Sequence, residues 1–336
     1  MKTREHWPPG QITRDRRGDS RQGSESSDSP TDAVESGDEL LVNLSEIGEI
    51  ELIILRRMRD FTIGEHRSQF QGTGFDFVGL REWQAGDRFS SIDWPQSTLT
   101  NFSPLIVREF EQPSTAAVIA VADASLSTRC GIDGVPIAAA IARAIATIGM
   151  SAVFFQDMFG LVTFDAGFRH LSAIRPRVGK NQVIHCLDAY QYRRGVQDVK
   201  QIGALSMTMT GFLRRTSLVP VISDFLFDNV GDVLKELSLL NSNHDVFLVL
   251  IDSAFAFELP SISVGWVEAF DVETASSRVM SRRAIRRMAR MVRDWQDQVT
   301  RLAGDAGLDV LRLGPDQTQN DIALVEFVAE RRLRKK

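Results

Sequence analysis

The sequence contains few cysteines and lacks the apolar segments of secreted and membrane-spanning proteins. Its two cysteines, Cys130 and Cys186, are too few for a metal cluster. They are typical of buried thiols in a reducing compartment, and a disulfide bridge between them is the alternative. The opening residues, MKTREHWPPG, carry no apolar stretch of a secretory signal, and no run of about 18 apolar residues follows. We therefore expect a cytoplasmic protein that does not span a membrane.

A basic excess and an ATPase motif are also missing. The formal net charge of -5 gives no reason to expect general affinity for nucleic acid. No Walker motif, G-x-x-x-x-G-K-[ST], occurs, so the chain itself should not hydrolyse ATP. The 43% of hydrophobic and 25% of charged residues instead describe an ordinary soluble globular protein, whose 336 residues allow one large or two modest domains.

Composition divides the chain into three parts. The first, residues 1–38, is rich in Ser, Asp, Arg, Gly and Pro and has almost no large aliphatic side chains, so we expect a disordered tail. The second, residues 39–112, begins with apolar periodicity that predicts a helix, or a helix pair interrupted near Gly48, and continues with short strands. The periodic residues are Leu40, Leu44, Ile47, Leu52, Leu55 and Met58. The third part, residues 113–336, has a different pattern.

In this third part, apolar runs alternate with amphipathic segments. Runs without polar alternation are typical of strands buried on both faces of a parallel sheet. We expect strands near residues 116–122, 159–164, 217–225, 244–252 and 309–313, and helices near 136–148, 181–187, 199–213, 230–240 and from 320 onwards. A turn after residue 164 predicts a hairpin at the sheet edge, and Pro220 is unfavourable inside a strand. The alternation predicts a doubly wound, Rossmann-like α/β sheet flanked by helices, with a smaller N-terminal β-containing segment.

Polar residues follow two of the expected strands directly. The run AAVIAVA leads into Asp123, Ser125 and Ser127, and the run SLVPVI ends in Ser223 and Asp224. Ligand sites in such sheets lie beyond the carboxyl ends of strands, at the switch point where two ends converge. Carboxylate and hydroxyl oxygens suit Mg²⁺ or Mn²⁺ and offer no thiolate or imidazole for zinc. The pattern predicts a divalent-cation site; the structural alternative is a polar turn that closes a strand.

Several segments together resemble the DUF58 family of bacterial proteins, whose core is similar to a von Willebrand factor A domain. The resemblance covers roughly residues 40–336 and is most specific in the run GTGFDFVGLREWQAGDRFSSIDW. Further matches are DASLS, FGLVTF, ISDF, HDVFLVLID and FELPSISVGWVEAFDVETA. The signature positions are Gly74, Phe77, Arg81, Glu82, Gly86, Asp87, Ile92, Asp93 and Trp94.

The charged signature residues have two interpretations. An internal salt-bridge network that holds the glycine-rich segment is favoured, and a binding surface is the alternative. The tryptophans Trp83 and Trp94 are expected to fill the core beside this network. The charged residues are Arg81, Glu82, Asp87 and Asp93.

The resemblance implies a metal-ion-dependent adhesion site, a von Willebrand A-type site in which Asp123, Ser125, Ser127 and Asp224 hold Mg²⁺ or Mn²⁺. An acidic side chain of a partner would take the open coordination position, so the cation could be held only in the complex. In the wider von Willebrand A group a threonine from an intervening loop completes the site. The corresponding loop is expected at residues 175–182, which contain no threonine, and Asn181 is the expected substitute.

The resemblance also implies a role, because DUF58 proteins are often linked with MoxR-type AAA+ ATPases and with larger von Willebrand A proteins. Such systems mature or chaperone client complexes, so the chain is expected to be an adaptor and not an enzyme. A Mg²⁺-dependent hydrolase of the haloacid dehalogenase type is the enzymatic alternative, although Ser125 stands where those phosphatases have a second Asp. A structural scaffold with a vestigial metal site is the third possibility.

Residues 278–293, RVMSRRAIRRMARMVR, predict a strongly basic helix with an apolar strip. An electrostatic surface for an acidic client protein, or for peripheral contact with an anionic membrane, is the functional interpretation. A solvated helix face is the structural alternative, and nucleic acid is disfavoured because no aromatic platform is interleaved. The candidate partner-binding residues are Arg282, Arg283, Arg286 and Arg287.

Overall fold

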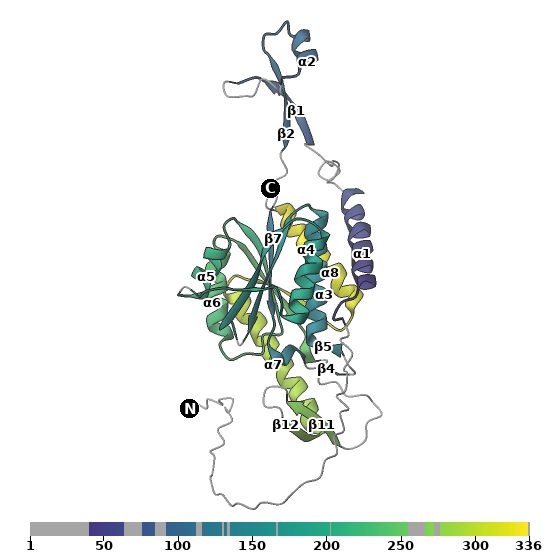
Figure 1. Cartoon of the computed structure of the whole chain (residues 1–336), viewed down its shortest axis with the longest axis vertical. Coiled ribbons are helices and arrows are strands. Elements are labelled where there is room, and N and C mark those ends of the chain that lie inside the picture. The colour runs from purple at the N-terminus through teal and green to yellow at the C-terminus, as the bar shows by residue number, and fades with distance from the viewer. Residues whose placement is uncertain are drawn as a thin grey trace, which may run out of the picture. The chain divides into compact units, whose positions relative to one another are not determined.

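A computed structural model of the chain describes most of the molecule beyond its first part. The described residues are 40–63, 76–84, 92–111, 116–129, 131–132, 135–165, 167–201, 203–254, 266–271 and 276–334. The expected tail over residues 1–38 lies outside them. Figure 1 shows the element order along the chain.

A seven-stranded sheet forms the centre of the described fold, in the order β13-β10-β9-β3-β6-β7-β8. Its strands are β3 (Ala117–Asp123), β6 (Met158–Asp165), β7 (His170–Arg177), β8 (Gln197–Asp198), β9 (Ser217–Ser223), β10 (Asp245–Ile251) and β13 (Asp309–Leu313). Five neighbouring strands, from β13 to β6, are parallel, and β7 and β8 are antiparallel to their neighbours. The first strand of this sheet along the chain is β3, in the middle. The chain then forms β6 on one side of β3 and later β9 on the other side. The switch point therefore lies between β3 and β9.

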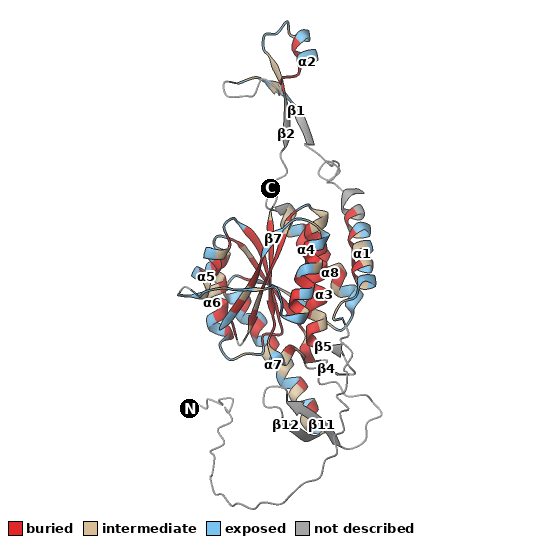
Figure 2. Cartoon of the chain, in the orientation of Figure 1, coloured by how far each residue is buried: buried red, intermediate tan, exposed pale blue. Residues whose placement is uncertain are grey.

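Helices cover both faces of the sheet (Figure 1). One face packs against α1 (Leu44–Ile63), α3 (Ile137–Phe154), α4 (Lys180–Tyr192) and α8 (Gln317–Arg334). The other packs against α5 (Leu205–Phe212), α6 (Val230–Asn241) and α7 (Arg282–Asp305). Successive residues of β3 alternate between the two apolar clusters, so the strand needs apolar side chains at every position. Figure 2 shows the resulting continuous buried layer. These features confirm the predicted doubly wound α/β fold.

Smaller elements complete the description and are each considered by themselves. β1 (Asp76–Glu82) and β2 (Ile106–Glu111) pair antiparallel, and α2 (Trp94–Leu99) lies between them in sequence. β11 (Trp266–Asp271) and β12 (Ser276–Ser281) form a second antiparallel pair. After β3 come a short 3-10 helix, η2 (Leu126–Arg129), and the two-residue strands β4 (Gly131–Ile132) and β5 (Val135–Pro136).

Several element boundaries differ from the expectations. Helix α3 runs to Phe154, about two turns beyond the expected end at residue 148, because the core still buries Met150 and Ala152 and the final residues Val153 and Phe154 pack against it. The first helix is continuous through Gly48. Only residues 205–212 of the expected helix 199–213 are helical. The hairpin of β6 and β7 forms as predicted, although β8 adds a short strand outside it.

Pro220 occupies the middle of β9, a central strand of the sheet. Its partner in β10 is Phe247, and the register on that side is unbroken. On the β3 side the register passes from Leu218 directly to Val221. Because proline has no N–H to donate, the break falls where its missing hydrogen bond would be. The strand persists because it is buried on both faces.

The segment α3 is also notable for its apolar character. It is the one helix among the described residues with the length and composition of a membrane span, and 78% of that window is buried inside the molecule. The core helix of an α/β protein can have the same length and the same apolar composition as a membrane span.

Candidate functional site

The candidate site lies at the carboxyl ends of β3 and β9. The two strands are parallel neighbours, with Ala122 of β3 paired to Ile222 of β9. The residues that follow, Asp123 on one strand and Asp224 after the other, therefore leave the sheet at the same edge. Both carboxyls are buried, at 2% and 4% exposure. The topology brings the two predicted carboxylates together at the switch point.

Hydrogen bonds organise the loop after β3 around Asp123. Its Oδ1 accepts from the backbone N–H of Ser125 at 2.9 Å. Its Oδ2 accepts from Ser223 Oγ of β9 at 2.6 Å. The hydroxyls of Ser125 and Ser127 lie 3.0 Å apart. The loop thus gathers one carboxylate and two hydroxyls, and Ser223 links them to the neighbouring strand.

Side chains of α7 hold the loop after β9 in place. Asp224 Oδ1 accepts from the N–H of Leu226 at 3.2 Å, and its carbonyl oxygen accepts from Gln296 Nε2 at 3.2 Å. The indole Nε1 of Trp295 donates to the carbonyl of Phe225 at 2.8 Å. Phe225 has a φ of 56°, an uncommon conformation for a bulky residue, and it is fully buried. Two adjacent side chains of one helix therefore fix the backbone that presents Asp224.

Both carboxyls resist ionisation in this arrangement. Burial raises the pKa of Asp224 to about 7, and the charge of Asp123 contributes in the same direction. Burial also raises the pKa of Asp123, and its hydrogen bonds to Ser223 and Ser125 oppose that rise. Asp165, at the end of β6, adds a further negative charge that raises the Asp123 pKa. A cation beside the two buried carboxyls would favour their ionised forms and would be stabilised by them.

Side chains from η2 and from the end of α4 also hold the loop after β3 in place. Tyr190 donates from its hydroxyl to the carbonyl oxygen of Asp123 at 2.7 Å. Arg193 donates to the carbonyl of Ala124. Arg129 donates to the carbonyl of Tyr190 at 3.0 Å, which ties η2 to the end of α4. Nothing in the sequence marks these residues, because each acts across a long stretch of chain and through backbone carbonyls.

The structure places Asn181 away from this group. β7 runs antiparallel to β6, so the loop that leads from β7 into α4 lies at the amino edge of the parallel strands. Asn181 stands at the start of α4, whereas Tyr190, which reaches Asp123, lies about 13 Å further along the helix axis. This position corrects the expectation that Asn181 completes the site. The loop that does return to the carboxyl edge, residues 193–204, contains no threonine either.

The residues present fit a hard divalent cation. Their donors are carboxylate and hydroxyl oxygens, the ligands that Mg²⁺ and Mn²⁺ prefer. Within the described residues no three or more His, Cys, Asp or Glu side chains form a group that could hold a metal ion. The hydroxyls of Ser125 and Ser127 would therefore have to contribute.

Comparison with known proteins identifies the family. Residues 79–299 match the family model described as Protein of unknown function DUF58. The chain belongs to the DUF58 family. No curated protein sequence matches this DUF58 chain.

Solved structures resemble the DUF58 chain only distantly. BatB from Bacteroides thetaiotaomicron is 14% identical, with a TM-score of 0.37 over 64% of this chain and 99% of its own. An aerotolerance-related membrane protein from Bacteroides fragilis NCTC 9343 is 12% identical, with the same TM-score and coverage. The pilus adhesin SpaC from Lactobacillus rhamnosus GG is 11% identical, with a TM-score of 0.37 over 66% of this chain and 30% of its own.

The DUF58 signature residues lie in the segment of β1, α2 and β2. Asp93 is buried and caps α2, because its side chain accepts from the N–H of Gln96 at 3.2 Å. Arg81 donates to the carbonyl of Glu82 at 3.0 Å. Trp94 is 54% exposed, so the expectation that it fills the core is wrong. Asp87 lies outside the described residues.

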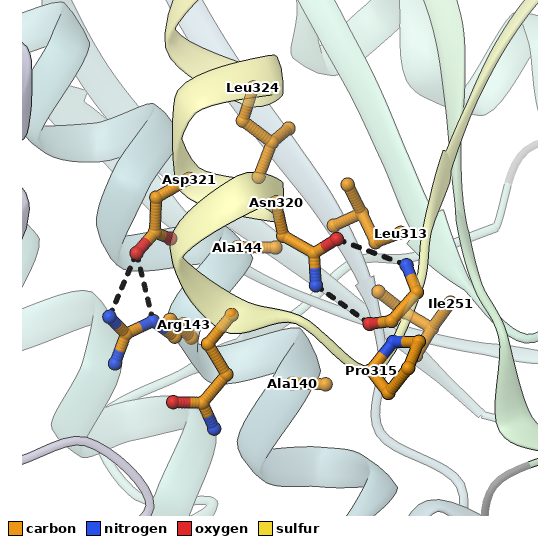
Figure 3. Close-up of a pocket in the computed structure, with 11 residues that line it drawn as sticks. Ala140, Arg143, Ala144, Ile251, Leu313, Pro315, Asn320, Asp321 and Leu324 are labelled. Carbon is orange, nitrogen blue, oxygen red and sulfur yellow. Dashed lines mark hydrogen bonds and ion pairs between the residues drawn. The ribbon is translucent and has the colours of Figure 1, made fainter.

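A cavity of about 320 Å³ opens at the same sheet edge of the DUF58 core, beside β10 and β13 (Figure 3). Its walls are mainly apolar, and Arg143, Asn320 and Asp321 are hydrogen-bonded to other residues of the lining. Arg143 Nη2 donates to Asp321 Oδ2 at 2.8 Å, and the amide of Asn320 bonds both backbone groups of Gly314. The cavity is lined by Ala140, Arg143, Ala144, Ile251, Leu313, Gly314, Pro315, Gln317, Asn320, Asp321 and Leu324. It offers apolar contact and little further hydrogen bonding.

Proposed function

We propose that this DUF58 protein is a non-enzymatic adaptor whose divalent-cation site docks a partner protein. The site is of the metal-ion-dependent adhesion type and consists of Asp123, Ser125, Ser127 and Asp224. The observation that carries the proposal is the convergence of two buried carboxyls at the β3–β9 switch point. No ion pair of either carboxyl occurs within the described part of the chain. A bound Mg²⁺ would supply the missing positive charge.

The rim of the site suits a protein partner. Leu126, between the two serines, is 50% exposed, and Leu226, two residues after Asp224, is 39% exposed. A partner could place a carboxylate on the cation and apolar side chains on these leucines. Such a rim combines one polar anchor with apolar contact, as protein interfaces commonly do.

Hydrolytic chemistry has less support. A phosphatase of the haloacid dehalogenase type needs a second Asp two residues after the first as general acid and base, and this chain has Ser125 there. The Ser125 hydroxyl is hydrogen-bonded to the Ser127 hydroxyl at 3.0 Å and to the carboxyl of Asp123, which in this proposal binds the cation. The one carboxyl of the site with a pKa near neutrality, Asp224, serves in this proposal as a cation ligand and not as a proton donor.

The partner expected from the family resemblance is a MoxR-type AAA+ ATPase, alone or with other von Willebrand A proteins. The ATPase would supply the work of client maturation, since this chain has no Walker motif. The adaptor would dock the ATPase or the client through the cation.

Calorimetric titration of the full chain with Mg²⁺ and Mn²⁺ tests the cation site. We expect one site in the wild type and loss of measurable binding in Asp123→Asn and in Asp224→Asn, which keep the side-chain volume. Asp165→Asn is the matched control, because it removes one negative charge near the site without removing a proposed ligand. It should weaken binding by less than about tenfold. Equal losses of cation affinity in all three variants would mean that the cation is attracted by the local negative charge in general and is not held by Asp123 and Asp224 as ligands.

A second experiment tests docking. The purified ATPase should bind the wild type in Mg²⁺ and release it in EDTA, and Asp123→Asn should not bind in either condition. Binding that persists unchanged in EDTA would favour a scaffold with a vestigial site.

A further inference from the structure

The first half of α7 concentrates positive charge where a helix tolerates it least. Within the sequence of α7, no Asp or Glu occurs before Asp294. Positive charges near a helix N-terminus oppose the helix dipole and destabilise the helix. The helix dipole therefore disfavours the arginines of the first turn, and Asp or Glu partners within the helix do not account for the rest. These arginines are Arg282, Arg283, Arg286, Arg287, Arg290 and Arg293.

Four of these side chains form one exposed stripe. Arg283, Arg286, Arg287 and Arg290 have the spacing i, i+3, i+4 and i+7, which places them on one helix face. All four are exposed. The stripe is about 10 Å long, from the rise of about 1.5 Å per residue. We call these four residues the arginine stripe.

The stripe lies beyond the carboxyl edge of the sheet. Gln296 of α7 donates to the carbonyl of Ile251 at 2.8 Å, at the end of β10. The residues of α7 that follow Gln296 pack along the sheet, and Val299 and Ala303 among them are buried in the core. The residues before Gln296 therefore extend in the other direction, about 20 Å to the helix start. Figure 1 shows α7 as one continuous helix over this length.

The chemistry of the stripe favours a carboxylate-rich protein segment over a membrane. Ile285 and Ala289, on the apolar strip of the same half-helix, are 5% and 6% exposed, so that strip is packed and unavailable to a bilayer. The helix contains no lysine. Arginine presents a planar fork that matches carboxylates with two parallel hydrogen bonds. We propose that the arginine stripe is a docking surface for an Asp/Glu-rich segment of a partner protein.

This surface is separate from the proposed cation site, since it uses no residue of that site and needs no metal. A fluorescein-labelled oligoglutamate peptide is the probe, and fluorescence anisotropy with the full chain is the measurement. We expect saturable binding that high salt abolishes and that EDTA and Asp123→Asn leave unchanged. This independence distinguishes failure of the stripe from failure of the cation site.

The decisive comparison uses two double variants with the same change in charge. Arg283→Gln/Arg287→Gln should weaken peptide binding by about threefold to tenfold, because two exposed ion pairs are lost. Arg214→Gln/Arg215→Gln, at exposed positions before β9, should bind the peptide as the wild type does. Circular dichroism should show both variants folded.

Three outcomes would overturn the proposal. The wild type could fail to bind the peptide, or the Arg214/Arg215 variant could lose as much affinity as the stripe variant. Alternatively, vesicles of phosphatidylserine and phosphatidylcholine could bind through the stripe arginines while the peptide does not, which would identify a membrane surface instead.

Discussion

At the scale of single residues, Asp224 couples the stability of the cation-free protein to pH. Its pKa in the folded protein is raised to about 7, from an ordinary value of 3.8, mainly by burial. A group with a raised folded pKa contributes stability that is fully present below its unfolded pKa and lost as pH rises through the folded value. The cation-free protein should therefore lose stability between about pH 4 and pH 7 and remain less stable above pH 7.

Thermal unfolding in EDTA across this pH range checks that dependence. Asp224→Asn should flatten it and should unfold at a temperature on the order of 5 °C higher than wild type at pH 8. Mg²⁺ should stabilise the wild type more at pH 8 than at pH 5, because a cation binds the ionised carboxylate. A wild type whose melting temperature in EDTA is the same at pH 5 and pH 8 would contradict the assigned burial of this carboxyl.

The same scale separates what the sequence predicts about the site from what it does not. Asp123 and Asp224 each follow an apolar strand directly, so the rule that parallel strand ends converge is enough to pair them. The misplacement of Asn181 was avoidable, because the hairpin predicted after residue 164 already reverses β7 and puts the loop before α4 at the amino edge of the parallel strands. Tyr190 and Gln296 act on backbone carbonyls far away in sequence, and no motif reports such contacts.

At the scale of elements, two glycines test how closely the helices pack. A Cβ at Gly48 in α1 would meet no atom within 4 Å. Gly48→Ala should therefore stabilise the protein by about 0.5–1 kcal/mol through helix propensity. A Cβ at Gly149 in α3 would lie 2.8 Å from Val183 Cγ1 of α4 and 3.0 Å from the Phe159 ring of β6. Gly149→Ala should destabilise by about 1–3 kcal/mol despite the same gain in propensity.

Urea denaturation of the two glycine variants measures this difference, and each serves as the control for the other. Opposite signs are expected. If Gly149→Ala were as stabilising as Gly48→Ala, the close approach of α3, α4 and β6 would be disproved.

Elements also show where periodicity is a sufficient guide. Continuous apolar runs predict β3 and β10 correctly, because both faces of these strands are buried. In α1 the predicted face is only partly right, because Ile47 and Met58 are buried as expected and other members of the pattern are not. Leu44 and Leu52 belong to the predicted periodicity yet are 72% and 55% exposed, while Ile50 and Ile54 are buried. Where apolar residues occur on more than one side of a helix, the elements that pack against the helix decide which side is buried. The sequence of the helix alone does not identify those elements.

At the scale of the whole molecule, an ion cluster joins three helices from distant parts of the chain. Arg143 of α3 donates from Nε and Nη2 to Asp321 Oδ2 of α8, at 3.0 and 2.8 Å. Its Nη1 donates to Glu46 Oε1 of α1 at 3.2 Å. Thr147 donates to the other oxygen of Asp321 at 2.8 Å. Asp321 is 1% and Arg143 8% exposed, so each depends on the other for compensation of its buried charge.

Removing one partner of this cluster should cost far more than removing both. Asp321→Ala should destabilise the protein by about 3–5 kcal/mol, because it leaves the Arg143 charge buried without its main partner. The double variant Arg143→Met/Asp321→Leu should recover most of that loss, since apolar side chains can fill the space. Glu46→Gln should cost less than about 1 kcal/mol, because the Glu46 side chain is partly open to solvent, at 29% exposure. A double-mutant cycle in urea measures all three terms. If Asp321→Ala and Glu46→Gln cost the same, the cluster would not be the buried junction that holds the first and last described helices against α3.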